Sequence, residues 1–330
     1  MKAAYIKETG GPEKIIYGEL PTPEPKAGEV LVKVGAVAVN PIDTYVRAGM
    51  VRVELPNPYI VGNDMAGTVE RVGEGVESFK PGDRVWCSNQ GSSGRQGTFA
   101  ELACVEQRWL HRTPEGVSDA DAAAVALVGI TAHIGIARRA KLHPGEILFV
   151  NGGSGGVGSM VVQMAKAIGA KVIATAGTDE RAEKCRSFGA DLAINYRKQS
   201  VATEVGKFAP DGVQVFWETR RDAEFESAIA LLAKHGRLIL MAGREARPVF
   251  PVGPFYVKDC ELHGFAMFNY SAEEQRESGD AINTWLAGGK LKANIDRVFP
   301  LEKTAEAHRL QEDNTIRHLG SLAGKIVLHP

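Results

Sequence analysis

The first third of the chain alternates short apolar runs with turn signals, which predicts a β-rich domain. Segments 30–34, 67–72, 83–86 and 98–103 are β-like, and turns such as Lys80-Pro81-Gly82-Asp83 lie between them. Short strands separated by turns that contain proline and glycine are typical of a compact antiparallel barrel or sandwich.

The pattern changes at an alanine-rich segment, 118–141, which has the period of a helix. From Glu146 onward, strand-like apolar runs alternate with helical stretches. The six runs cover residues 147–150, 171–175, 192–195, 213–217, 237–241 and 261–268. Continuously apolar strands that are separated by helices predict a parallel sheet with both faces covered.

The end of the chain returns to β-like sequence. After a helical stretch at 272–288, the runs at 298–299 and 325–328 fit the first domain better than a seventh parallel strand. We therefore expect a discontinuous first domain, residues 1–122 and 290–330, and a second domain formed by residues 123–289.

Composition limits the possible partners. The 330 residues are 44% hydrophobic and 24% charged, with 39 Lys and Arg against 40 Asp and Glu. A net charge of −1 provides no field that would attract nucleic acid or anionic lipid, so the expected partner is a small molecule. No continuous apolar run approaches the roughly 20 residues that span a bilayer, residues 1–8 lack the apolar region of a signal peptide, and the four cysteines form no C-x-x-C pair. We expect a cytoplasmic protein.

A glycine cluster connects the first strand of the second domain to a helix. Gly153, Gly155 and Gly158 satisfy G-x-G-x-x-G between a buried strand and the helical stretch 159–168. Glycines at these positions allow a tight turn and a close approach of the backbone, and the helix N-terminus attracts a pyrophosphate. The cluster predicts a dinucleotide site.

The next strand favours NADP(H) over NAD(H). A protein that binds NAD carries an acidic residue there for the ribose 2′-hydroxyl, whereas 174–178 contains none. Arg181 provides positive charge for a 2′-phosphate, and Tyr196 and Arg197 follow the third strand. The alternative is that these three are ordinary surface side chains. Asp179 is interpreted as a residue of the first turn of the next helix.

Several motifs together resemble one family. They are Gly10-Gly11-Pro12-Glu13, 40–49 (Asn-Pro-Ile-Asp-Thr-Tyr-Val-Arg-Ala-Gly), 80–85, the glycine cluster and Ala305-Glu306-Ala307-His308. The chain resembles the zinc-free, zeta-crystallin-like quinone oxidoreductases of the medium-chain dehydrogenase/reductase superfamily. The resemblance implies an α/β fold with a doubly wound, six-stranded parallel Rossmann sheet, a GroES-like β-rich catalytic domain and a homodimer.

The zinc relatives in this superfamily have Cys where this chain has Asn40, and Gly-His-Glu where it has Gly62-Asn63-Asp64. Without thiolate or imidazole at these places, zinc lacks its preferred ligands. We expect no metal.

The resemblance also assigns site residues. Tyr45 matches the family tyrosine beside the nicotinamide, and Asn40 lies nearby, so either can donate a hydrogen bond to a developing oxyanion. The alternatives are packing for Tyr45 and turn formation for Asn40. The other positions that match cofactor contacts are Thr131, Ser154, Gly155, Gly156, Val157, Gly177, Tyr196, Met241, Ala242, Gly243, Arg244, Phe265, Ala266 and Met267. Met241, Phe265 and Met267 can equally serve packing.

One segment departs from the family. After the fourth strand, where the family commonly has a small glycine-containing turn, this chain has Trp217-Glu218-Thr219-Arg220-Arg221. The two arginines either contact an anion or are solvated loop charges.

These observations predict an NADPH-dependent reductase of quinones or enones that transfers hydride without zinc. Two alternatives remain open from the sequence: an enoyl-thioester reductase of the same fold, and a protein that binds NADPH without turnover.

Overall fold

The computed structural model describes residues 1–330, which divide into two compact units. Unit 1 comprises Met1–Leu127 and Ser271–Pro330, and unit 2 comprises Val128–Tyr270. Helix α8 (Ala272–Ala287), which the sequence places in the second domain, therefore falls within unit 1.

Packing explains the position of α8. Its Gly279 lies against the ring of His111, and its Asn283 side-chain oxygen accepts a 3.0 Å hydrogen bond from Trp86 Nε1. Trp86 and His111 are themselves stacked, with ring centroids 4.3 Å apart. The helix thus completes the hydrophobic face of unit 1.

Unit 2 is built on a parallel sheet of six strands in the order β11-β10-β9-β12-β13-β14. The strands are β9 (Ile147–Asn151), β10 (Lys171–Ala176), β11 (Leu192–Asn195), β12 (Val213–Glu218), β13 (Leu232–Leu240) and β14 (Glu261–Gly264). The order reverses between β9 and β12, so the predicted doubly wound Rossmann sheet is confirmed. The last strand ends at Gly264 rather than at residue 268.

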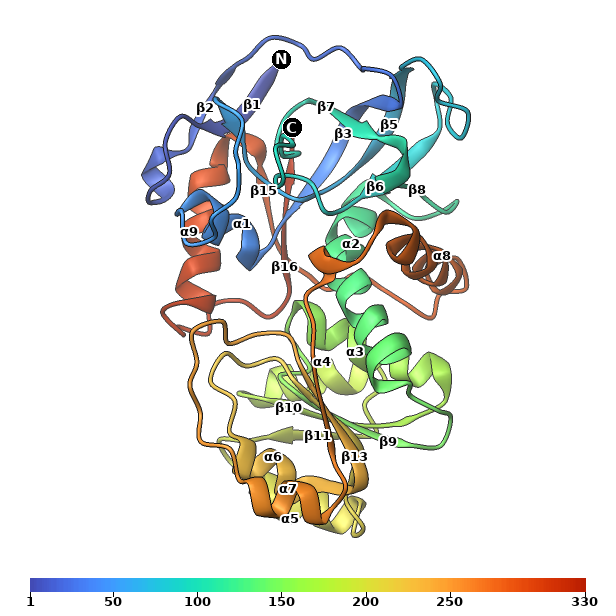
Figure 1. Ribbon diagram of the computed structural model, residues 1–330, viewed down its shortest axis with the longest axis vertical. Coiled ribbons are helices and arrows are strands. Elements are labelled where there is room, and N and C mark those ends of the chain that lie inside the picture. Colours follow the sequence, from blue (N-terminus) through green and yellow to red (C-terminus); the bar gives the residue numbers. More distant parts are fainter. The chain divides into compact units, whose positions relative to one another are not determined.

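Helices cover both faces of this sheet. They are α3 (Gly156–Ile168), α4 (Asp179–Ser187), α5 (Val201–Phe208), α6 (Phe225–Leu231) and α7 (Val252–Val257), with the short 3-10 turn η4 (Met267–Asn269). Figure 1 shows α3 and α4 on one face of the sheet and α5, α6 and α7 on the other. Buried residues such as Phe149, Ile173 and Phe216 fill the core on the sheet, as continuously apolar strands require.

One long apolar helix runs from Asp119 to Ala140. It comprises α2 (Asp119–His133) and the π-helical η3 (Ile134–Ala140), and Ser118 accepts the backbone N–H of Asp121 at its start. By length and composition this helix can cross a membrane, but 78% of its most apolar window is buried inside the protein. These bounds agree with the helix that the sequence predicts over 118–141, and Thr131 and His133 interrupt its apolar residues.

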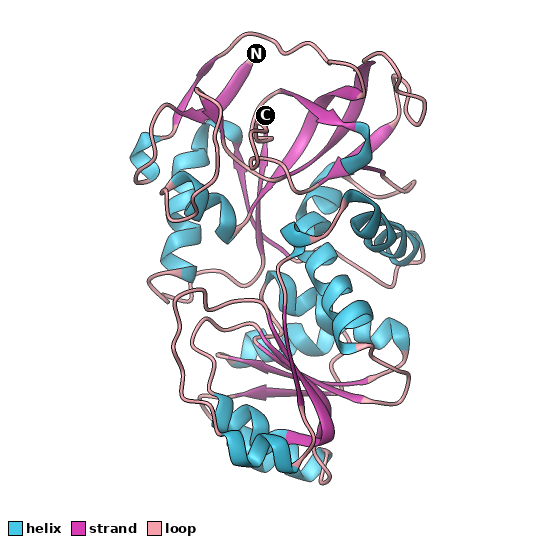
Figure 2. Cartoon of the chain, in the orientation of Figure 1, coloured by secondary structure: helices cyan, strands magenta, loops and turns pink.

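Unit 1 contains two sheets (Figure 2). A three-stranded sheet has the order β2-β1-β4, and a seven-stranded sheet has the order β15-β16-β3-β5-β6-β8 with β7 paired to β3. The strands are β1 (Lys2–Ile6), β2 (Ile16–Glu19), β3 (Glu29–Val39), β4 (Tyr59–Ile60), β5 (Asp64–Val72), β6 (Arg84–Cys87), β7 (Leu102–Glu106), β8 (Leu110–Arg112), β15 (Ile295–Pro300) and β16 (Lys325–His329). Every pair is antiparallel except β15 with β16.

The C-terminal strand β16 pairs with β3 along residues 37–39, so the end of the chain joins the sheet of unit 1. The predicted strand at 98–103 begins only at Leu102, because the residues before it pair elsewhere: Phe99 and Ala100 contact β1 through an isolated bridge between Ala100 and Ala3. The remaining elements are η1 (Pro12–Lys14), α1 (Pro41–Arg47), η2 (Gln107–Trp109), η5 (Leu301–Lys303) and α9 (Thr304–Thr315).

Candidate functional site

The glycine loop between β9 and α3 has two positions where the protein itself excludes a larger residue. A Cβ on Gly158 would lie 2.1 Å from the carbonyl oxygen of Gly152, and one on Gly153 would lie 2.7 Å from the Cβ of Ala174. Gly152 has φ +86°, which side chains disfavour. These glycines are needed for the turn and for packing of the loop on β10.

Gly155 is different, because a Cβ there would touch only the Gly152 carbonyl oxygen, at 3.5 Å. Gly155 is also the N-cap of α3 and provides no side-chain cap to the first turn. The N–H groups of that turn and the positive end of the helix dipole are therefore available to an anion. Ser154, Gly155, Gly156 and Val157 lie at this helix N-terminus, whose chemistry suits an anionic group such as a pyrophosphate.

The end of β10 carries no acidic side chain, and its two threonine hydroxyls are used within the protein. Thr175 is buried, its hydroxyl donates to Asn151, and it accepts the Gly152 N–H. Thr178 caps α4 by accepting the N–H of Arg181. The Thr175 hydroxyl is therefore not left for a 2′-phosphate, whereas the exposed Thr178 hydroxyl only accepts and keeps its hydrogen for donation.

Gly177, Tyr196 and Arg197 come together at this edge of the sheet. A Cβ on Gly177 would lie 2.7 Å from Tyr196 Oη and 3.7 Å from Arg197 Nε, and the Tyr196 side chain is exposed. Arg181 lies in the first turn of the adjacent α4. The hydroxyl end of Tyr196 and the guanidinium of Arg197 therefore border a position that lacks a side chain.

Asp179 has a structural role. It is the first residue of α4, and its carboxylate accepts from Asn195 Nδ2 at 2.6 Å and pairs with Lys198. The hydrogen bond with Lys198, followed by that with Asn195, holds the pKa of Asp179 below its ordinary value. The carboxylate ties α4 to the segment after β11.

Two segments of predicted cofactor contacts follow the strands β13 and β14. Met241, Ala242, Gly243 and Arg244 follow β13, and Phe265, Ala266 and Met267 follow β14, so both lie at the carboxyl ends of strands. Met267 is buried, and Phe265 packs edge-to-face on Trp217 at 6.2 Å. Thr131 is also buried, within α2.

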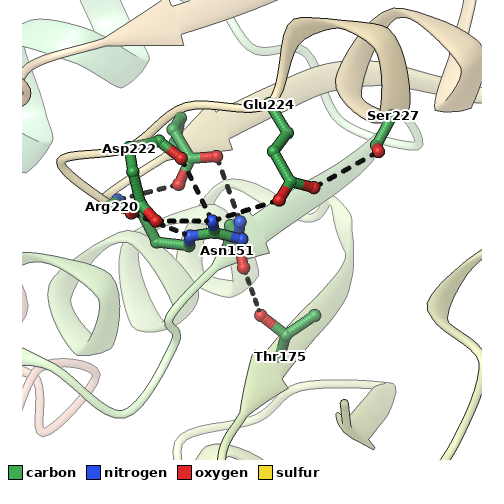
Figure 3. Close-up of polar contacts among 7 residues, drawn as sticks. Asn151, Thr175, Arg220, Asp222, Glu224 and Ser227 are labelled. Atoms are coloured by element: carbon green, nitrogen blue, oxygen red, sulfur yellow. Dashed lines mark hydrogen bonds and ion pairs between the residues drawn. The ribbon is translucent and has the colours of Figure 1, made fainter. Parts of the chain in front are cut away.

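Arg220 is neutralised by its own loop. Its guanidinium lies 3.1 Å from the carboxylate of Asp222 and 3.6 Å from that of Glu224 (Figure 3). With two carboxylates on one guanidinium, the solvated loop charge describes Arg220 better than an anion site does. Arg221 is half-buried.

In unit 1, α1 carries Tyr45 and begins after Asn40. Tyr45 is half-buried, whereas Asn40 is completely buried. The Asn40 amide donates to Asp64 at 2.7 Å and to the Ala38 carbonyl at 3.3 Å, and its oxygen accepts from Lys325. Both donor hydrogens of Asn40 are thus engaged inside unit 1.

A buried polar cluster surrounds Asn40. Asn63 donates to Asp43 at 2.6 Å, and the Lys325 ammonium donates to the carbonyl of Val39 at 2.7 Å. Burial raises the pKa of Asp43 to about 7, raises the pKa of Asp64 and lowers the pKa of Lys325. Sequence reasoning missed Asp43 and Lys325; the available signal was a charged residue at the edge of an apolar run.

The cluster does not fit a zinc ion. The structure contains no group of three or more His, Cys, Asp or Glu side chains that could hold a metal. A lysine ammonium instead contacts Asn40 and faces Asp64, two of the positions that correspond to zinc ligands in the zinc relatives.

The chain is similar in sequence to two described families and to known oxidoreductases. Residues 26–115 match the family described as alcohol dehydrogenase GroES-like domain, and residues 156–283 match the family described as zinc-binding dehydrogenase. The quinone oxidoreductase of Homo sapiens is 32% identical over 330 residues, which cover 99% of this chain and 97% of that protein.

Two further similar proteins have NADPH in their descriptions. The NADPH-dependent alkenal/one oxidoreductase of Arabidopsis thaliana is 30% identical over 339 residues, with 100% of this chain and 80% of that protein covered. A crystal structure of Escherichia coli quinone oxidoreductase complexed with NADPH superposes with a TM-score of 0.86 at 25% identity, covering the whole of both chains.

Proposed function

The chain belongs to the quinone oxidoreductase branch of the medium-chain dehydrogenase/reductase superfamily, and from this we propose that it is an NADPH-dependent reductase of quinones and enones. The observation that carries the proposal is the loop from Asn151 to Gly158. Gly155 at the N-terminus of α3 is open there, since a Cβ on it would contact only the Gly152 carbonyl oxygen.

NADPH, when bound, supplies a hydride from C4 of its nicotinamide. Ser154, Gly155, Gly156 and Val157 hold the pyrophosphate through the backbone N–H groups and the helix dipole. Thr131, Met241, Ala242, Gly243, Arg244, Phe265, Ala266 and Met267 are proposed to position the rest of the cofactor. For Met267 and Phe265 this role is additional to packing, because one is buried and the other lies on Trp217.

Selectivity for NADPH is assigned to Gly177, Arg181, Tyr196 and Arg197. Two properties support this assignment: the end of β10 has no carboxylate, and the carboxylate of Asp179, the first residue of α4, is paired with Asn195 and Lys198. A 2′-phosphate would therefore meet positive charge without the carboxylate that an NAD site carries at the end of this strand.

We assign the class of hydride acceptor from the stability of the anion that hydride addition produces. Hydride addition to a simple ketone gives an alkoxide, whose conjugate acid has a pKa near that of water, about 15.7, whereas a quinone gives a phenolate-like anion with a conjugate acid near about 10. The difference of roughly 6 units corresponds to about 8 kcal/mol that the site need not provide. Quinones and enones suit a site without zinc ligands.

Tyr45 is the proposed donor to the developing oxyanion. Asn40, the other candidate, has both amide hydrogens engaged with Asp64 and Ala38. We assign it to holding the start of α1, and so the position of Tyr45.

Consumption of NADPH with a panel of acceptors tests the proposal. Benzoquinone, phenanthrenequinone and a short enone are expected to be reduced, and crotonyl thioester and a simple ketone are not. Faster turnover of crotonyl thioester would favour an enoyl-thioester reductase, and tight NADPH binding without turnover of any acceptor would favour a binding protein.

We propose a cytoplasmic homodimer that forms through β14. This strand is at the edge of its sheet, and Leu262 on it is exposed, as are Tyr256 and Val257 on the preceding helix α7. Unpaired backbone groups and exposed apolar side chains on an edge strand favour pairing with a second copy. Light scattering should give twice the chain mass, and Leu262→Lys should reduce it.

A further inference from the structure

A row of polar side chains crosses the carboxyl end of the sheet in unit 2. Asn151 on β9 lies directly opposite Glu218 on β12, and Thr175 follows Ala174, which lies opposite Val150 on β9. The row therefore spans the point where the strand order reverses, where ligands of such sheets bind. Thr175 and Glu218 are buried.

The hydrogen bonds along this row all donate toward Glu218, and Figure 3 draws the one between Thr175 and Asn151. The Glu218 carboxylate accepts the backbone N–H of Arg220 at 2.7 Å and the amide of Asn151 at 3.0 Å. The Thr175 hydroxyl donates to the Asn151 side-chain oxygen at 2.7 Å and accepts the Gly152 N–H at 3.0 Å.

This direction follows from the carboxylate. Because ionised Glu218 can only accept, Asn151 must turn its NH₂ toward it and its oxygen toward Thr175. The hydroxyl must then donate to Asn151, which leaves its lone pairs for the N–H of Gly152. One carboxylate on β12 thereby fixes the direction of the first glycine peptide in the loop.

We propose that Glu218 is a positioning residue for the dinucleotide pyrophosphate, acting through Asn151 and Thr175 on the glycine loop. The inference rests on the proposed function, since it concerns the same cofactor. Glu218 is not assigned a contact with the cofactor. Its role is to keep the peptide at Gly152, and the turn that begins there, in the orientation that suits an anion at the N-terminus of α3.

The row also links the loop to β12 at a second place. The Thr219 hydroxyl donates to the backbone carbonyl of Asn151, and a Cβ on Gly152 would lie 2.5 Å from that hydroxyl oxygen. The segment after β12 is therefore built against the glycine loop, and its exposed charged side chains Asp222 and Glu224 are turned to Arg220.

Glu218→Gln tests the direction of the row. Glutamine has one acceptor oxygen for the two donors that Glu218 binds, so its NH₂ would face either the NH₂ of Asn151 or the backbone N–H of Arg220. In either orientation a donor loses its partner. We expect the Kd for NADPH to rise about tenfold, which corresponds to ~1.4 kcal/mol. The Kd for adenosine 2′-monophosphate, which lacks the pyrophosphate, is expected to stay within about twofold of the unsubstituted protein.

A reciprocal substitution distinguishes positioning from simple loss of structure. Asn151→Asp alone places two carboxylates side by side and is expected to weaken NADPH binding at least as much. Glu218→Gln combined with Asn151→Asp exchanges donor and acceptor, so that the introduced glutamine amide donates to the introduced aspartate while Thr175 still donates to that carboxylate. The double variant is expected to recover NADPH binding to within about threefold of the unsubstituted protein.

Glu226→Gln is the matched control, because it removes an exposed carboxylate from α6 of the same unit. If Glu218→Gln does not fold, Thr175→Val and Thr175→Ser provide the comparison, and only the valine is expected to weaken NADPH binding while sparing adenosine 2′-monophosphate. Unchanged NADPH binding in Glu218→Gln, equal weakening of both ligands, or a double variant no better than the single ones would overturn the inference. Failure of the unsubstituted protein to bind NADPH would instead overturn the proposed function.

Discussion

The ammonium group of Lys325 lies 3.8 Å from the carboxylate of Asp64, and both side chains are almost completely buried. Lys325 begins β16 and Asp64 begins β5, and both strands flank β3. The same ammonium contacts Asn40 and the carbonyl of Val39. A buried positive charge is thus held by one carboxylate and two uncharged oxygens at the start of α1.

Lys325→Met should destabilise unit 1 strongly. Removing one partner of a buried pair leaves the other charge uncompensated, which typically costs about 3–5 kcal/mol. Urea unfolding followed by circular dichroism measures the loss. Adding Asp64→Asn should recover part of it, and a single variant within about 1 kcal/mol of the parent would contradict the buried ion pair.

Stability should depend on pH through Asp43. Burial, opposed by its hydrogen bond with Asn63, raises the pKa of Asp43 to about 7, so the folded protein holds a proton that the unfolded chain releases near 3.8. Its contribution to stability is complete below about pH 4 and declines as the pH rises toward about 7. Comparison of urea midpoints across this range should show a decline that is smaller in Asp43→Asn. Equal slopes in the two proteins would show that Asp43 titrates normally.

Two glycines of the loop should separate folding from cofactor binding. Gly155→Ala meets only an ordinary contact at 3.5 Å and has φ −77°, so its thermal midpoint should stay near that of the parent while KM for NADPH rises. Gly158→Ala would place its Cβ 2.1 Å from the Gly152 carbonyl and should lower the thermal midpoint. If both variants lost stability to the same extent, Gly155 would have no specific link to the ligand.

Gly279→Ala should destabilise the protein although alanine ordinarily favours a helix. Its Cβ would lie 2.1 Å from Nδ1 of His111, a ring held by stacking on Trp86, so overpacking by about 1–3 kcal/mol should exceed the ordinary gain of about 1 kcal/mol. Gly206→Ala on α5, where nothing lies within 4 Å, is the control and should stabilise by about 0.5–1 kcal/mol. Denaturant midpoints of the pair give the comparison, and a stabilised Gly279→Ala would contradict the described packing of α8.

The sequence predicted local features of the site better than it predicted contacts between strands. The glycine loop depends on consecutive residues between β9 and α3, so its spacing was sufficient. The row of Thr175, Asn151 and Glu218 exists only because β9 lies between β10 and β12, and no short motif contains that order. Lys325 likewise reaches Asn40 only through the pairing of β16 with β3.

The sequence also did not show which neighbours the polar atoms of a candidate side chain contact. Asn40 looked equally suited to donate to a substrate, but burial against Asp64 and Lys325 uses its amide. For Arg220 the sequence left open an anion contact or a solvated loop charge, and the carboxylates of Asp222 and Glu224 beside it favour the loop charge. In both cases the residue type was compatible with a functional role, and the neighbours decided how its polar atoms are used.

The fate of a deuterium label tests the central claim most directly. Protein dialysed against a chelator is incubated with an enone and NADPH that carries deuterium at both C4 positions of the nicotinamide, and the product is analysed by mass spectrometry and proton NMR. Direct hydride transfer predicts one deuterium per product, on the carbon β to the carbonyl, at an undiminished rate after chelation. A reduced product without carbon-bound deuterium, or activity that depends on restored metal, would contradict the account.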